Sequence, residues 1–247
     1  MKYVLSVFFY IIAIISFLLI AISVIIFTYL FKPRQYDKFV KFLCRFFLRS
    51  IFIRVKTYGL EKIDPDKTYI FMSNHVNIFD VFLLNGYIPN FARGVEQERH
   101  FNWPVWGKVI TRFGNIPIHQ TKLKSAMKSL DKTEEIIKSG TSIIILPEGH
   151  RTRTGKMRSF MRGPFLLAQK AKAGIVPMGI IDAYKIKKVS HWLIQPGTIQ
   201  LVFGEAIPYK KTKHLSSREL KDLVKDKIQI LIDNSQNLNK QSRKVNK

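Results

Sequence analysis

The segment from Tyr3 to Phe31 contains no charged residue, and this feature restricts the possible folds of the chain more than any other. A helix crosses a bilayer core with about 20 apolar residues, so the segment is long enough to span a membrane or to enter it at a tilt. It is too long for the apolar core of a signal peptide, and no small-residue cleavage site follows it. The sequence therefore predicts a membrane helix that either spans the bilayer or enters only one leaflet.

A second membrane-binding segment is predicted from Tyr36 to Val55. Basic residues recur at helical spacing among phenylalanines, a pattern typical of helices in the headgroup plane. There each cation contributes about 1 kcal/mol of attraction to an anionic leaflet. A core helix with one solvated face has the same pattern, so that alternative stays open. The excess of Lys and Arg after Phe31 predicts a cytoplasmic location for the rest of the chain. The basic residues are Lys38, Lys41, Arg45 and Arg49, and the apolar ones are Phe39, Phe42, Leu43, Phe46, Phe47 and Phe52.

The charge balance requires an anionic partner. The chain has 41 Lys and Arg against 17 Asp and Glu, a formal net charge of +24. Nucleic acid, an anionic membrane and phosphorylated substrates all fit this excess. A membrane-anchored nucleic-acid-binding protein is one alternative, but no helix-turn-helix, RNA-recognition or zinc-finger spacing is visible, so we expect no nucleic-acid partner. The single cysteine, Cys44, excludes an internal disulfide, and the sequence has no metal-ligand motif.

From Lys56 onward strand-like and helix-like segments alternate. This predicts an α/β fold: a single layered domain with a mostly parallel or mixed central sheet flanked by helices, preceded by N-terminal membrane helices. The predicted organisation is membrane-anchoring helices at 1–55, a catalytic domain at 56–234 and a disordered basic tail at 235–247. Strands are predicted at 68–72, 141–146 and 175–181, with a further pair at 192–194 and 198–203, and helices at 123–138, 163–173 and 216–232.

A candidate acid–base pair follows the first of these strands. His75 stands five positions before Asp80. An imidazole can take a proton from an alcohol near neutral pH, and a carboxylate on its other ring nitrogen would fix the tautomer. On one continuous helix the two side chains would point about 140° apart. They meet only if the chain turns between them, with Asp80 in the first turn of a helix that Asn77 could cap. Alone, the spacing is also typical of a structural loop histidine and a helix-start aspartate.

A second polar segment, Leu146 to Arg151, follows the predicted central strand. Loops beyond the carboxyl ends of strands are where α/β folds bind ligands. This loop carries Glu148, Gly149 and Arg151, and an arginine fork matches a phosphate group. Alone, it is equally compatible with an ordinary solvated basic loop. Two weaker signals are Gly114, where a glycine permits close approach of a backbone or ligand, and the apolar strand at 175–179.

Taken in this order, the four segments resemble the glycerolipid acyltransferase family, whose best-known members are the 1-acylglycerol-3-phosphate O-acyltransferases. The family pattern is Asn-His-x4-Asp, a Gly-x-Ile-x-Ile-x-Arg block, Pro-Glu-Gly-Thr-Arg and a Val-Pro strand, and the resemblance spans Tyr69 to Gly179. It implies that His75 is the catalytic base and that Asp80 orients it. It further implies a substrate-binding set of Asn74, Gly114, Glu148, Gly149, Arg151 and Arg162, with Arg151 on phosphate and Glu148 organising its loop or contacting glycerol.

Two residues depart from the family pattern. His119 stands where the second block usually has arginine, and His150 replaces the threonine of the third. The family arginine helps to hold the acceptor phosphate, so these departures leave the acceptor open. Arg112, Lys122 or Arg162 could take its place.

The expected activity is transfer of a fatty acyl group from acyl-CoA or acyl-ACP to the free hydroxyl of 1-acylglycerol-3-phosphate, forming phosphatidate in phospholipid biosynthesis. Another lysophospholipid or a lyso-aminolipid is the alternative acceptor. The chemistry requires no cofactor and no metal. The expected partners are an anionic membrane leaflet, acyl-CoA or acyl carrier protein, and a lysophospholipid. A non-catalytic lipid-binding relative is a further alternative, against which the intact His75 and Asp80 argue.

Overall fold

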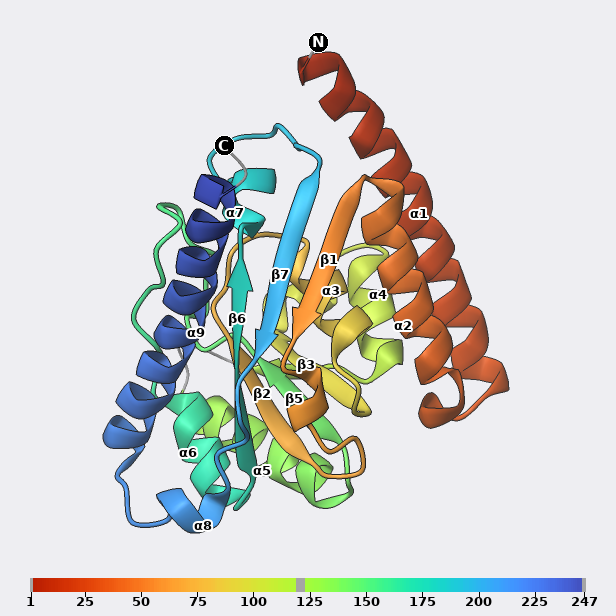
Figure 1. The fold of residues 1–247 in the computed structure, drawn as a ribbon. Coiled ribbons are helices and arrows are strands. Elements are labelled where there is room, and N and C mark those ends of the chain that lie inside the picture. Colours follow the sequence, from red (N-terminus) through yellow and green to blue (C-terminus); the bar gives the residue numbers. More distant parts are fainter. Residues whose placement is uncertain (1, 119–122, 246–247) are drawn as a thin grey trace.

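The computed structural model describes residues 2–118 and 123–245, without the side chains of residues 123–128 and 239–245. Within that part of the chain a seven-stranded sheet carries helices on both faces (Figure 1). The elements are α1 Lys2–Leu30, α2 Pro33–Ser50, β1 Ile53–Tyr58, η1 Leu60–Lys62, β2 Tyr69–Ser73, α3 Asp80–Tyr87, β3 Ala92–Gln97, η2 Glu98–Asn102, α4 Trp106–Phe113, β4 Ile116–Ile118, α5 Leu123–Lys138, β5 Ser142–Ile145, α6 Gly163–Lys170, β6 Gly174–Ile181, α7 Ala183–Ile186, β7 Gly197–Phe203, α8 Tyr209–Thr212 and α9 Ser217–Val245.

The sheet is mixed, as the sequence predicts. Its order is β1-β7-β6-β2-β5-β3-β4, and every neighbouring pair is parallel except β6 and β7. The carboxyl ends of β2, β3, β5 and β6 therefore lie at one edge, where the loops after β2 and β5 meet. The strand predicted at 192–194 is wrong. The backbone N–H of Ile194 donates to the hydroxyl of Ser6 and its carbonyl accepts from the same hydroxyl, so α1 takes the groups that a strand would pair.

The central strand β2 is buried on both faces because its side chains alternate between two apolar layers. Phe71 packs into the layer beneath α1, α2, α3 and α4, whereas Ile70 and Met72 pack into the layer beneath α5, α6 and α9. Figure 1 shows these two groups of helices on opposite sides of the sheet. An uninterrupted apolar run in the sequence thus corresponds to a strand in the middle of three layers.

The uncharged segment forms α1. Among the described helices, this is the one that is long and apolar enough to cross a membrane. One face packs on the domain along most of the helix. Small residues make the approach close, and the Ser16 hydroxyl lies 3.1 Å from that of Ser50 in α2. The opposite face exposes large apolar side chains from Tyr3 to Phe31. An exposed apolar surface of this size is typical of a site that contacts lipid or another protein.

The second helix differs from its prediction in extent and in orientation. It ends at Ser50 rather than Val55, and β1 begins at Ile53, so the first strand of the sheet starts before residue 56. Lys41 does not face a membrane: its ammonium group pairs with Asp37 and donates to the carbonyls of Pro89 and Asn90. Arg45 likewise donates to the carbonyl of Gly86. The exposed residues of the helix include Lys38 and Arg49 together with the phenylalanines Phe39, Phe42 and Phe46.

The expected disordered tail is also wrong for residues 235–245, because α9 continues to Val245. Ser235 is buried, and its hydroxyl donates to Gln200 Oε1 on β7. Periodicity alone predicts that this helix ends near Leu231, the last residue of its apolar stripe. The hydrogen bond from Ser235 attaches the helix to the sheet beyond that point.

Candidate active site

The loop between β2 and α3 brings His75 and Asp80 together at the carboxyl edge of the sheet. His75 Nδ1 lies 2.7 Å from Asp80 Oδ2, and the carboxylate is buried while the imidazole side chain stays 18% exposed. The chain turns between the two residues, and Asp80 opens α3. The sequence predicted contact between His75 and Asp80 only if the chain turned between them, and the structure shows both the turn and the contact. With the carboxylate accepting from Nδ1–H, the proton-accepting lone pair of the ring lies on Nε2.

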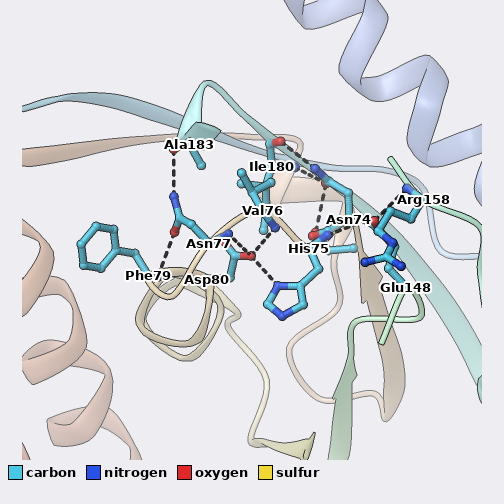
Figure 2. Close-up of polar contacts among 11 residues, drawn as sticks. Asn74, His75, Val76, Asn77, Phe79, Asp80, Glu148, Arg158, Ile180 and Ala183 are labelled. Atoms are coloured by element: carbon cyan, nitrogen blue, oxygen red, sulfur yellow. Dashed lines mark hydrogen bonds and ion pairs between the residues drawn. The ribbon is translucent and has the colours of Figure 1, made fainter. Parts of the chain in front are cut away.

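Two backbone groups hold the carboxylate in place. Asp80 Oδ2 also accepts from the N–H of Val76 at 2.6 Å and from that of Asn77 at 3.1 Å (Figure 2). These donors belong to the segment that links His75 to Asp80, so the loop folds around the carboxylate. Because a backbone N–H can only donate, the atom that faces Nδ1 must be an acceptor. The backbone thereby fixes which ring nitrogen carries the proton.

Two asparagines attach this loop to the neighbouring strand. The Asn74 side chain pairs with the backbone of Ile180 in β6, accepting from its N–H at 2.7 Å and donating to its carbonyl at 2.9 Å. Asn77 donates to the carbonyl of Ala183 at the start of α7 and accepts from the N–H of Phe79 (Figure 2). Asn74 was predicted to bind substrate. In the structure its side chain instead attaches the loop to β6.

Glu148 joins the loop after β5 to the loop after β2. One oxygen accepts from the backbone N–H of His75 at 2.7 Å and the other from that of Arg158 at 2.8 Å. Burial raises the pKa of this carboxyl, and the two N–H donors oppose that rise. The N–H of Thr152 also donates to the carbonyl of His75, so the two loops are joined by bonds in both directions. Glu148 thus organises its loop.

Gly149 and Arg151 lie beside this junction. Gly149 has φ +71°, a left-handed conformation that favours glycine, and its carbonyl accepts from Gln97 Nε2 at the end of β3. Arg151 is exposed. Burial lowers the pKa of Lys187, and the charge of Arg151 lowers it further, so the two cations lie near each other. The loop after β5 therefore carries positive charge close to His75.

Two predicted substrate-binding residues lie elsewhere. Gly114 ends α4 with φ +87° and approaches the side chain of Arg93, so it is a helix C-cap ahead of β4 rather than part of the His75 site. Arg162 Nε donates to the hydroxyl of Ser217 at the start of α9. His119 and Lys122 lie outside the described residues.

The structure adds one arginine, Arg99, that no sequence signal suggested. Burial lowers the pKa of His150, and the charges of Arg158, Arg99 and His75 lower it further. The charges that lower the pKa of His150 thus come from two arginines and from His75. Arg99 comes from η2, at the end of β3, and no motif marks it. Only the adjacency of β3 and β5 in the sheet brings it here. Among the described residues no group of three or more His, Cys, Asp and Glu could hold a metal ion.

Comparison with known proteins agrees with this geometry. The model of the Acyltransferase family matches residues 54–181, just over half of the chain. A 1-acyl-sn-glycerol-3-phosphate acyltransferase of Pseudomonas aeruginosa is 32% identical over 156 residues, covering 63% of this chain and 60% of that protein. A chloroplastic 1-acyl-sn-glycerol-3-phosphate acyltransferase of Arabidopsis thaliana is 26% identical over 209 residues, covering 82% of this chain and 58% of that protein. The chain thus spans about three-fifths of the length of these two relatives.

A solved structure shares the fold. The crystal structure of the 1-acyl-sn-glycerophosphate acyltransferase PlsC from Thermotoga maritima superposes with a TM-score of 0.81 at 22% identity, covering 95% of this chain and 96% of that one. At this identity the likeness concerns the fold, including its N-terminal region. The matched residues 54–181 contain His75, Asp80 and the loop of Glu148. On this evidence the chain belongs to the acyltransferase family.

Proposed function

We propose that this protein transfers a fatty acyl group from a thioester to the free hydroxyl of 1-acylglycerol-3-phosphate and so forms phosphatidate. One observation supports this proposal most: Asp80 holds Nδ1 of His75, leaving Nε2 as the basic atom of a partly exposed ring. The relatives from Pseudomonas aeruginosa and Arabidopsis thaliana are named for this activity.

In the proposed reaction His75 is the general base. The acceptor hydroxyl attacks the thioester carbonyl carbon while Nε2 takes the hydroxyl proton. The tetrahedral intermediate then collapses, the bond from carbon to sulfur breaks, and the thiolate receives the proton from the imidazolium. Asp80 stabilises the charged ring, and a base placed in this way typically contributes about 10² to 10⁴-fold in rate. The nucleophile is the substrate's own oxygen, so the protein forms no covalent intermediate.

The cations around His150 are the proposed site for the acceptor phosphate. Arg99 and Arg158 act on the pKa of His150, Arg151 follows His150 in the chain, and arginine pairs with phosphate through two parallel hydrogen bonds. The same positive surface would attract the acyl donor, because both coenzyme A and acyl carrier protein are acidic. We propose acyl-CoA or acyl-ACP as that donor.

We also propose that the enzyme works on the cytoplasmic face of a membrane. The exposed apolar face of α1 supports this, together with the exposed Phe39, Phe42 and Phe46 of α2. Because α1 packs on the domain from Ser6 to the hydrogen bond between Tyr29 and Arg112, it favours entry into one leaflet with the domain attached. The lipid acceptor could then reach His75 without being extracted into water.

A second acceptor class is favoured by one observation. His150 stands where the family has threonine, beside Arg99 and Arg158, and an imidazole offers the substrate different hydrogen bonds from a hydroxyl. A different lysophospholipid or a lyso-aminolipid is therefore the competing acceptor.

One assay tests both. Purified protein in detergent is supplied with labelled acyl-CoA or acyl-ACP and a panel of lysolipids, and labelled product is quantified. We expect lysophosphatidate to give the highest kcat/KM and His75→Ala to give none. Faster turnover of another lysolipid would transfer the proposal to that acceptor, and full turnover by His75→Ala would refute the base assignment.

A further inference from the structure

The turn at Trp103–Val105, between η2 and α4, combines exposure, apolar side chains and backbone strain. Trp103 is 51% exposed and Val105 39% exposed. We propose that this turn is a bilayer-inserting tip, a contact with lipid separate from α1. The inference rests on the membrane association within the proposed function and adds a second element to it.

The backbone of the turn is strained. Val105 has φ 59° and ψ −63°, and the N–H of Trp106 donates to the carbonyl of Pro104 at 2.6 Å, which closes a γ-turn of the disfavoured hand. A β-branched residue rarely adopts positive φ. Just after the turn, Gly107 packs directly against the backbone of Phe101, because a Cβ atom at this position would lie 2.1 Å from the carbonyl oxygen of Phe101. Such strain persists only when surrounding contacts impose it, and it is concentrated at functional segments.

Those surrounding contacts centre on Glu96, at the end of β3. Its carboxylate accepts from His100 Nδ1 at 3.2 Å, from Trp106 Nε1 at 3.3 Å and from Asn115 Nδ2 at 3.0 Å. These donors lie on η2, α4 and the residue before β4, so one side chain holds both ends of the turn. The ring of Trp103 rests on His100, with centroids 4.6 Å apart. Partly buried hydrogen bonds thus hold the turn with two apolar side chains pointing outward.

The position of the turn identifies lipid as its partner. The Trp106 ring lies 5.9 Å from that of Phe17 in α1, and α4 lies alongside α1 (Figure 1). The turn therefore continues the surface of a helix whose uncharged outer face needs lipid. An exposed cation, Lys108, follows the turn and complements the phosphates of headgroups. Tryptophan favours this boundary between hydrocarbon and water.

The same contacts connect the turn to the catalytic loops. The Phe17 ring also meets Phe82, two residues after Asp80, at 6.5 Å. On the other side Gln97, next to Glu96, donates to the carbonyl of Gly149. A tip seated in the interface would therefore hold the mouth of the site close to the bilayer.

Site-specific labelling tests insertion directly. The only cysteine, Cys44, is buried, and burial raises its pKa to about 12, so it reacts slowly. Trp103→Cys and the control Leu166→Cys are each labelled with the polarity-sensitive fluorophore NBD in the full chain. Leu166 is 39% exposed on α6, across the sheet from α1. On adding vesicles of equal parts phosphatidylcholine and phosphatidylglycerol, we expect the label at 103 to brighten and shift to shorter wavelength, and the label at 166 to keep its aqueous emission. Aqueous emission at 103 from vesicle-bound protein would overturn the proposal.

A second measurement separates this proposal from the proposed function. Trp103→Asp should weaken vesicle binding roughly tenfold, on the scale of losing one buried aromatic side chain. Trp103→Asp should raise KM for acceptor in vesicles and leave turnover of a short-chain, monomeric lysophosphatidate unchanged. The control Leu166→Asp should change neither vesicle binding nor turnover in either assay. Unchanged vesicle binding by Trp103→Asp would refute the tip. Absence of turnover in every variant and in the wild type would instead refute the proposed function, while the NBD signal would still decide the tip.

Discussion

The substitution Asp80→Asn tests how His75, the proposed general base, is held. Three donors converge on Asp80 Oδ2: His75 Nδ1 and the N–H groups of Val76 and Asn77. Both backbone groups can only donate, so an asparagine must present its carbonyl oxygen at this point. The amide would then accept from His75 as the carboxylate does. We therefore expect the variant to keep the ring orientation and the tautomer and to lose only the negative charge.

The magnitude follows from the distance. Two unit charges 2.7 Å apart attract by about 6 kcal/mol at an effective dielectric constant of ~20. With about half a charge developed on the imidazole in the transition state, Asp80→Asn loses about 3 kcal/mol, on the order of 10² in kcat. Asp80→Ala is a harsher change, because it leaves two buried N–H groups without their acceptor at about 1–3 kcal/mol each.

The assay measures thiol release from acyl-CoA at saturating lysophosphatidate, and urea unfolding gives the stability of each variant. We expect kcat to fall in the order wild type, Asp80→Asn, Asp80→Ala, with near-wild-type stability for the asparagine variant and a clear loss for the alanine variant. His75→Ala gives the floor. If Asp80→Asn is folded but as inactive as His75→Ala, the backbone donors do not fix the tautomer and the reasoning fails.

Three further outcomes are expected. His75→Ala should abolish acyl transfer and still bind vesicles, as measured by flotation in a density gradient. Loss of vesicle binding would show a folding defect instead. Burial raises the folded-state pKa of Glu148 above its unfolded value of about 4.5, so its stabilising contribution is complete below that value and is lost as pH rises through the folded pKa. The unfolding free energy of wild type relative to Glu148→Gln should accordingly decrease as pH rises, and a constant or growing difference in denaturant melts would contradict this. Gly107→Ala should destabilise the protein by roughly 2 kcal/mol or more in thermal unfolding, since its Cβ would meet the backbone of Phe101, whereas Gly163→Ala, with nothing within 4 Å, should be close to neutral. Equal melting temperatures for the two would contradict the tight packing around the turn.

Local signals in the sequence determined the central strands, the long apolar helix and the pairing of His75 with Asp80. An uncharged segment excludes any environment but lipid or protein interior, and a continuous apolar run such as β2 identifies a strand buried on both faces. The order of four short motifs predicted the acyltransferase family, which the family model confirms. Each of these signals lies within a few consecutive residues, so the sequence alone can contain it.

The tertiary structure decided everything that depends on distant segments meeting. Periodicity placed Lys41 on a membrane-facing surface, but carbonyls from the loop before β3 attract it inward. The strand expected at 192–194 is absent because α1, far away in sequence, takes its backbone bonds. Arg99 reaches the site only because β3 and β5 are neighbours in the sheet. Composition and spacing fix what one segment can do, whereas burial and charge at a site arise from the segments packed around it.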